Sequence, residues 1–519
     1  MSVAFTAPDR APMFHVSLIL EALRARPAVM FWVAALAQGL LWTLVPSLFY
    51  AAPPGEVPLV LAVGHEWQLG SAYGPPLAYW LAEIAFEFAG RNIAGLYLLS
   101  QVCVVVAYWA VFALGHRVVG AAHAAMAILL MAGISVFTVS TIEFGPAVLA
   151  LPLVGLSFLF AYRALADSQR TDWLALGLTL GLLLLTTYAG LILIGLMALF
   201  VVTTAHGRSH LRSVGPWAAA GVIVLVNVPH FYWLIRAGLN PAQHLAALPS
   251  LIVADKRLAA WANLLLVLLV GHAGLVVLML VAGGLFEGRR TAAPAIEREP
   301  IDPFARNFVF FFAIFPAFVA TLIAVLFGLP APVGSAGPLV VLSGLAVIVA
   351  AGDVIRLYRQ RTAALVWLGL LVVPPAVIVA ATVTLPWTAA VDLEVSKPAD
   401  AIGQFFTETF RRRTGKALAI VIGDARTAGL VAFASPDRPS LYIDGAPERA
   451  PWITDEAVRE KGAVVTWTAT DNAGTPPAAL KARFPEMVAE VPRSFDRSVQ
   501  GRLALLRFGW AVIRPRGVR

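Results

Sequence analysis

Residues 362–387 read TAALVWLGLLVVPPAVIVAATVTLPW and contain no Asp, Glu, Lys or Arg. Residues 28–50 and 258–286 form two more uncharged runs of similar length. The hydrocarbon core of a membrane is about 30 Å thick, and about 20 residues of helix, each rising about 1.5 Å, cross it. Soluble cores do not contain such runs repeatedly, so the sequence predicts a protein that crosses a membrane many times.

The composition agrees with this class. Hydrophobic residues make up 59% and charged residues 13% of the 519-residue chain, and its mean hydropathy is +0.80. The net charge of +8 comes mostly from Arg in short connections beside apolar runs. That placement is typical of membrane topology and lipid contact, so we expect no nucleic-acid partner. The single cysteine, Cys103, lies in an apolar run, which excludes a disulfide framework and a cysteine-based metal site.

The distribution of Lys and Arg predicts an orientation. The eleven predicted spans are residues 28–50, 93–115, 121–140, 146–163, 173–187, 189–205, 215–236, 260–285, 308–327, 338–352 and 363–386. With the N-terminus inside, the inner connections hold most of the Arg residues between Arg10 and Arg361, and the outer loops carry little beyond Arg91, Lys256 and Arg257. This asymmetry follows the positive-inside rule. An odd number of spans places the C-terminus outside.

Two parts of the chain differ from the spans. The outer loop at residues 51–92 is rich in Pro and aromatics, and residues 78–88 in it predict a short interfacial helix. The polar, Pro-containing connection at residues 288–307 predicts a mobile inner linker. After Trp387, strand-like and helix-like runs alternate, with strands expected near residues 418–422, 441–443, 464–468, 503–508 and 510–514. The predicted fold is therefore mainly α, a polytopic helical bundle at residues 1–387 followed by a soluble α/β domain at residues 388–519.

Ionisable groups beside membrane spans are costly and are often functional, so they are the first candidates for a site. Glu143 lies in the outer turn between the third and fourth predicted spans, where it either caps the next helix or faces an outer cavity together with the first loop. His65 and Glu66 are neighbours in the chain and point apart on a helix, which argues against a metal pair. Aromatic residues such as Tyr73 fit an interfacial belt without any substrate.

The order of these features resembles the GT-C superfamily of polyprenyl-phosphate-sugar-dependent glycosyltransferases. The similarity is to the bacterial branch related to protein O-mannosyltransferases (glycosyltransferase family 39), which includes lipid A sugar transferases. The first span is followed by an early acidic residue, Glu56, then GHEWQLG at residues 64–70 and PPLAYWL at residues 75–81. The second outer turn, with EF at 143–144 and LALPL at 149–153, resembles that branch's E-F-N-x-N-x-x-x-L-P-x motif. RRRTGK at 411–416, GD at 423–424 and SPDRPS at 435–440 resemble its outer α/β domain.

The resemblance implies a function and a set of roles. It implies transfer of a sugar from a polyprenyl-phosphate donor to a lipid or glycan acceptor on the periplasmic face of a bacterial inner membrane. Glu56 occupies the position of the general base, and Glu143 occupies a second acidic position that in some members helps to hold a divalent metal ion (Mg, Mn or Zn). The chemistry needs a base on the acceptor and compensation for charge on the departing phosphate. The remaining residues that we expect to contact substrate are His65, Glu66, Tyr73, Arg91, Lys256 and Arg257.

Four polar positions depart from the family pattern. The usual Asp is Glu56, a Lys-His pair before Pro-Pro is replaced by residues 73–74, the Lys of a T-K-Y motif is Thr187, and an Asn is Gly145. These changes indicate either a site rearranged for another donor or acceptor, or a non-catalytic relative. Composition alone also allows a transporter or a lipid flippase, although the sequence shows no convincing internal repeat and its candidate polar groups gather at the outer interface.

Overall fold

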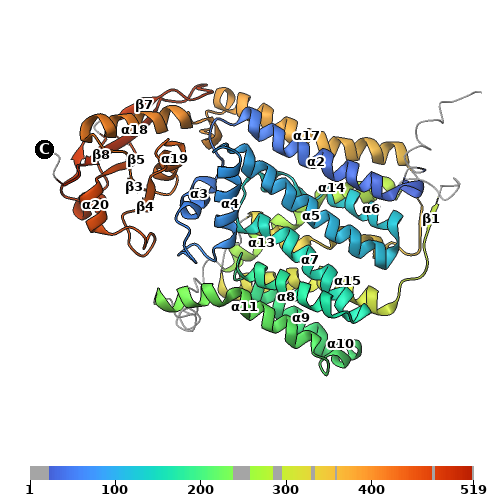
Figure 1. Ribbon diagram of the computed structural model, residues 1–519. Coiled ribbons are helices and arrows are strands. Elements are labelled where there is room, and N and C mark those ends of the chain that lie inside the picture. Colours follow the sequence, from blue (N-terminus) through green and yellow to red (C-terminus); the bar gives the residue numbers. More distant parts are fainter. Residues whose placement is uncertain are drawn as a thin grey trace, which may run out of the picture.

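The computed structural model of the chain describes residues 21, 23–237, 257–283, 295–328, 333–356, 359–469, 471 and 474–516. Figure 1 shows a helical bundle with a mixed α/β lobe at one end, which confirms the predicted fold class. The bundle helices are α2 (Pro27–Phe49), α5 (Ala94–Val119), α6 (Ala121–Met131), α7 (Pro146–Asp167), α8 (Arg170–Leu184), α9 (Gly190–Thr203), α11 (Gly215–Arg236), α13 (Arg257–Gly271), α14 (Ala273–Ala282), α15 (Pro303–Phe327), α16 (Ser343–Ala350) and α17 (Gln360–Thr388).

Each predicted span coincides with one of these helices, except that the span at 260–285 is formed by α13 and α14 together, and several differ from a full membrane crossing. Among the described residues, seven helices are long and apolar enough to cross a membrane, counting Arg257–Ala282 as one, and a bent pair would make an eighth. The bent pair corrects the span predicted at 121–140, because α6 and the 3-10 turns at 135–142 meet at 86°. The other three predicted spans are the shorter α8, α9 and α16. The long apolar runs thus predicted the membrane class correctly and overstated the length of individual spans.

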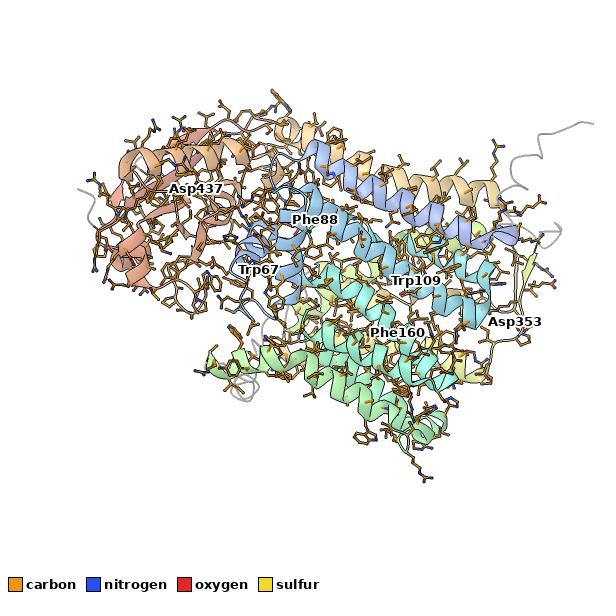
Figure 2. The ribbon with its side chains drawn as sticks, viewed as in Figure 1. Trp67, Phe88, Trp109, Phe160, Asp353 and Asp437 are labelled. Carbon is orange, nitrogen blue, oxygen red and sulfur yellow. The ribbon has the colours of Figure 1, made fainter. Side chains whose placement is uncertain are left out.

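Contacts at the two ends of the bundle show that the chain alternates between them. At one end, the backbone N–H of Leu77 donates to the carbonyl of Leu185, and the N–H of Ala51 donates to Val395. At the other end, Arg117 pairs with Asp167, and β1 (Ala295–Glu297) pairs with β2 (Val354–Arg356). Asp353 and Asp437 lie at opposite ends of the molecule in Figure 2. The first long loop and the C-terminal lobe therefore share one end, and Arg-rich connections gather at the other, as the parity of eleven segments predicts.

The β1–β2 pairing corrects a second expectation. Residues 295–307 were predicted to lie in a mobile linker, but the first three form a strand, and α15 begins at Pro303. Asp302 caps that helix by accepting hydrogen bonds from the backbone N–H groups of Phe304 and Ala305 at 2.9 and 3.2 Å. Polar composition predicted disorder here because it does not reveal a pairing between segments far apart in the chain.

The lobe is built on a six-stranded mixed sheet. Its strands are β3 (Ile420–Gly423), β4 (Ser440–Ile443), β5 (Ala463–Thr468), β6 (Val488–Ala489), β7 (Arg493–Phe495) and β8 (Leu506–Ile513), in the order β4-β3-β5-β8-β6, with β7 also paired to β8. β3 runs parallel to β4 and β5, and β8 is antiparallel to β5. Helices α18 (Ala399–Thr414), α19 (Thr427–Ala434), α20 (Asp455–Lys461) and α21 (Ala478–Arg483) complete it. The two final strands predicted at 503–508 and 510–514 are one continuous strand, β8.

The first outer loop joins the bundle to the lobe. It contains α3 (Val57–His65) and α4 (Leu77–Phe88), and Figure 1 shows both helices between the bundle and the lobe. The helix predicted at 78–88 is confirmed as α4, and its inner face is buried, with Ala78, Ala82 and Phe86 almost inaccessible, while Phe88 on its outer face is exposed. The Phe86 ring packs 5.6 Å from that of Phe433 on α19. The loop is thus a packed layer, and one large apolar cluster continues from the bundle through it into the lobe.

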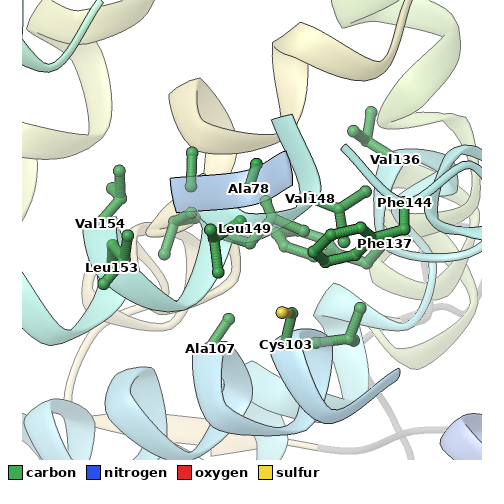
Figure 3. Packing of buried hydrophobic residues seen from close by; sticks show 14 of the residues in the cluster. Ala78, Cys103, Ala107, Val136, Phe137, Phe144, Val148, Leu149, Leu153 and Val154 are labelled. Carbon is green, nitrogen blue, oxygen red and sulfur yellow. The ribbon is translucent and has the colours of Figure 1, made fainter. Parts of the chain in front are cut away.

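Figure 3 shows the centre of the bundle. Phe137, Phe144, Val148 and Leu149 pack around the buried side chain of Cys103. The cysteine is a free thiol and one of the smaller apolar groups of this core. The packing fixes the segment before α7, and with it the turn that carries Glu143.

Candidate active site

A cavity of about 1240 Å³ opens where the bundle, the first loop and the lobe meet. Its walls are mainly apolar side chains of α3, α7, α9, α15 and α17, and its rim is formed by the loop before α3, the turn before α7 and residues 392–395. The described polar residues on its lining include Glu56, Tyr73, Glu143, Thr187, Asp392, Glu394 and Arg426. An apolar wall with a charged rim suits a ligand that has a hydrocarbon tail and a polar head.

Glu56 is positioned by the start of α3. Pro54 and Gly55 precede it, and Gly55 has a φ of 53°, a left-handed conformation that glycine adopts without strain. Glu56 is the N-cap residue of α3, and its carbonyl accepts the N–H of Val60 at 3.0 Å. Its side chain is exposed and lines the cavity. The carboxylate is therefore available to a ligand there.

Glu143 lies beside Glu56, as the parity of the spans predicted. A Cβ placed on Gly55, the residue before Glu56, would lie 2.1 Å from Oε2 of Glu143, so this carboxylate rests directly against the Gly55 backbone. Burial within the cavity walls raises the pKa of Glu143, and the negative charges of Glu394 and Glu56 raise it further, while Arg426 acts in the opposite direction. The proximity of the two acids is confirmed, and their roles stay predictions.

Three charged residues of the rim were missed by the sequence analysis. Asp392 and Glu394 come from the segment after α17, and Arg426 comes from the turn between β3 and α19. Nη2 of Arg497 lies 3.0 Å from Oδ2 of Asp392, and Nη1 of Arg426 lies 3.3 Å from Oε1 of Glu394. The strand-turn-helix pattern around Gly423 was the available signal, since residues after parallel strands often face a ligand.

His65 and Glu66, predicted to contact substrate, lie outside this lining among the described residues. Nδ1 of His65 lies 3.0 Å from Oε1 of Glu83. The pKa of Glu66 is raised chiefly by burial, while its interaction with Ser440 of the lobe acts in the opposite direction. Both residues thus belong to the contact between the loop and the lobe. Tyr73 does line the cavity, and its buried hydroxyl has no hydrogen-bond partner among the described residues.

The outer cations expected near the donor phosphate are not gathered at the cavity. Arg91 pairs with Glu87 at 3.0 Å on an exposed face of the first loop. Arg257 begins α13 and is not on the described lining, and Lys256 lies outside the described residues. Arg426 is the cationic side chain on the described part of the lining.

The structure gives little support for a bound metal. Among the described residues, no group of three or more His, Cys, Asp and Glu side chains could hold a metal ion. Glu143 has carboxylates nearby but lacks a ligand set of the size that Mg, Mn or Zn sites use. The side chains that the structure describes therefore do not supply the ligand set of the predicted metal.

Comparisons with known proteins add to this geometry. Residues 73–233 match the protein family described as dolichyl-phosphate-mannose-protein mannosyltransferase. Two crystal structures of ArnT from Cupriavidus metallidurans share the fold at 12% identity. The one bound to undecaprenyl phosphate has a TM-score of 0.62 and covers 94% of this chain and 98% of that chain. The apo structure has a TM-score of 0.52, with 94% and 97% covered. No curated protein matches the sequence.

The family match and the shared fold together confirm the resemblance predicted from the motifs. The chain shares the fold of ArnT and, over residues 73–233, resembles a family of mannosyltransferases. Its matched region begins at Tyr73, inside the first outer loop, and ends at Trp233 in α11. It therefore includes Glu143 and the bent span and leaves Glu56 outside.

Proposed function

We propose that this protein moves a sugar from a polyprenyl-phosphate donor to a lipid or glycan acceptor, at the periplasmic face of a bacterial inner membrane. The observation that carries the proposal is the cavity, which joins an apolar wall among membrane helices to a rim with two adjacent carboxylates. A polyprenyl chain suits the wall, and a phosphosugar suits the rim. The similar ArnT structure, bound to undecaprenyl phosphate, supports this class of donor.

The proposed reaction is an inverting displacement. The carboxylate of Glu56 takes the proton of the acceptor hydroxyl, and the acceptor oxygen forms a bond to the anomeric carbon of the sugar. The bond from that carbon to the phosphate oxygen breaks, and its electron pair leaves with the polyprenyl phosphate. Glu143, whose raised pKa favours the protonated form more than usual, is placed to hydrogen-bond the sugar beside Glu56.

Replacement of Glu56 tests this function. Purified protein in lipid nanodiscs is incubated with polyprenyl-phosphate sugars that carry a radiolabelled sugar, and with lipid or glycan acceptors. Wild type should transfer the label and release polyprenyl phosphate. Glu56→Gln keeps the size of the side chain and removes the base, so turnover should fall by about 10²–10⁴-fold. Glu87→Gln, an exposed carboxylate of the same loop outside the described lining, is the control and should keep wild-type turnover.

The same experiment separates the alternatives. Full activity of Glu56→Gln would refute its role as base. A transporter or flippase would move the intact donor across the bilayer without breaking the sugar–phosphate bond. A non-catalytic relative would bind the donor and release no polyprenyl phosphate in any variant.

A further inference from the structure

The charges on the described cavity lining are unbalanced for a phosphate ligand. Four carboxylates, Glu56, Glu143, Asp392 and Glu394, lie on the lining, and the cation among them is Arg426. A phosphate adds negative charge, and cleavage of the sugar–phosphate bond leaves more of it on the departing oxygen. In a cavity with largely apolar walls, such charge needs a nearby cation.

The guanidinium of Arg426 can still donate hydrogen bonds to a ligand, whereas the charge of Asp392 is already neutralised by Arg497. Nε and Nη2 of Arg497 donate to the two carboxylate oxygens of Asp392, both at 3.0 Å. Arg426 meets Glu394 through one contact of 3.3 Å, and its side chain remains 74% exposed. A guanidinium has five N–H donors, so within the part of the chain that the structure describes most of those of Arg426 are available. A single exposed ion pair contributes little to stability, and a structural role does not account for this residue.

The backbone of the turn that carries Arg426 is held by a close strand contact and by two hydrogen bonds. Gly423 ends β3 with a φ of 150°, and a Cβ there would lie 2.2 Å from the carbonyl oxygen of Thr466 on β5. Oδ1 of Asp424 accepts the backbone N–H groups of Arg426 at 3.0 Å and Thr427 at 2.8 Å. The glycine keeps the two strands close, and the aspartate fixes the first turn of α19. Arg426 is thereby held at the carboxyl edge of the parallel strands, which faces the membrane cavity.

We propose that Arg426 binds the donor phosphate, so that the C-terminal lobe supplies the cation of a site whose acids come from the membrane half. The inference rests on the proposed function. On donor binding, the guanidinium exchanges the carboxylate of Glu394 for phosphate oxygens, which it can meet with two parallel N–H donors. It stays there while charge builds on the leaving phosphate.

Lipid binding tests the proposal without depending on turnover. Full-length protein in nanodiscs is titrated with undecaprenyl phosphate, with undecaprenol as the neutral chain and with phosphatidylglycerol as an ordinary anionic lipid. Arg426→Gln should weaken undecaprenyl phosphate binding by about tenfold or more, because the phosphate loses a charged hydrogen-bond donor. Undecaprenol binding should not change. Arg426→Lys should recover part of the loss. Arg516→Gln, which removes the exposed Arg516–Glu456 pair of the same lobe, should match wild type.

A second variant separates loss of the cation from loss of the ion pair. Glu394→Gln breaks the same pair and frees Arg426, so undecaprenyl phosphate should bind it at least as tightly as wild type. Equal binding by wild type and Arg426→Gln would overturn the inference and leave the proposed function intact. Equally weak binding by Arg426→Gln and Glu394→Gln would overturn it too, by showing that the pair matters rather than the cation. A wild-type protein that does not prefer undecaprenyl phosphate to undecaprenol and phosphatidylglycerol would refute the proposed function itself.

Discussion

At the scale of single residues, Glu83 shows how the lobe is fixed over the cavity. Its side chain is almost fully buried and lies between His65, at 3.0 Å, and Arg438 of the lobe, at 2.7 Å. The Arg438 guanidinium also lies 4.8 Å from the centre of the Phe86 ring. Burial on its own raises the pKa of Glu83, but the hydrogen bonds and charges of His65 and Arg438 outweigh it and hold the pKa below the usual range. The carboxylate therefore favours the ionised form and binds the loop to the lobe.

Replacing Glu83 should loosen this junction. Glu83→Gln leaves Arg438 buried without its counter-charge, which costs about 3–5 kcal/mol for a buried pair. Thermal unfolding in detergent measures the loss, and Glu83→Gln combined with Arg438→Met should recover part of it. The pKa of Glu83 is lower in the folded protein than the ordinary carboxyl value, so its ionisation stabilises the fold at pH values above that ordinary value. This stabilisation is lost as the pH falls through the pKa of the folded protein. The difference between wild type and Glu83→Gln should therefore shrink below about pH 4. Equal melting temperatures at neutral pH would contradict this account of Glu83.

The site residues also show what the sequence alone can predict. Glu56 and Glu143 were found because a carboxylate beside an apolar span is rare and because span parity puts both on one side. Arg426 and Glu394 were missed because they follow ordinary turns in a polar domain, where charges are common. Only the folded lobe, lying over the first loop, brings them to the cavity. Arg91 and Arg257 are not on the described lining, because two residues on the same side of the membrane can still lie far apart along its surface.

At the scale of elements, the bent span depends on buried polar side chains. The break between α6 and the 3-10 turns leaves backbone groups unpaired inside the bundle. Nε2 of Gln38 donates to the carbonyl of Phe137 at 2.8 Å. Nε2 of Gln101 donates to Oγ1 of Thr141 at 3.0 Å, and that hydroxyl donates in turn to the carbonyl of Thr138 at 2.6 Å. Unpaired backbone groups are costly at membrane depth, so these amides support the break. The hydropathy of residues 121–140 predicted a continuous helix, since it carries no information about partners on other helices.

Gln38→Leu tests this support. The substitution puts an apolar side chain of similar size in α2 and leaves the Phe137 carbonyl without its donor. The free energy of unfolding should fall by about 1–3 kcal/mol. Thermal unfolding in detergent again gives the measurement. Leu36→Ala, at a position of the same helix that is 56% exposed, is the control and should change stability little. Should Gln38→Leu unfold at the wild-type temperature, the bend does not depend on this hydrogen bond.

At the scale of the whole molecule, the chain alternates between two ends, and the C-terminal lobe lies at the end opposite most Arg-rich connections. Under the proposed orientation, the positive-inside rule predicts that this lobe lies on the periplasmic side. Alkaline phosphatase fused after Arg519 should therefore be active in bacterial cells, and green fluorescent protein fused there should be dark. The opposite pair of results would put the lobe in the cytoplasm and overturn the proposed location of the reaction.

The central claim is that the cavity under the lobe holds a polyprenyl phosphate with its head at the carboxylate rim. An experimental structure of the full chain with undecaprenyl phosphate bound tests it most directly. We expect the lipid tail along the apolar wall of α9 and α15, and the phosphate within hydrogen-bonding distance of Arg426, near Glu56 and Glu143. A phosphate bound elsewhere, with only solvent beside the rim carboxylates and Arg426, would contradict this binding mode.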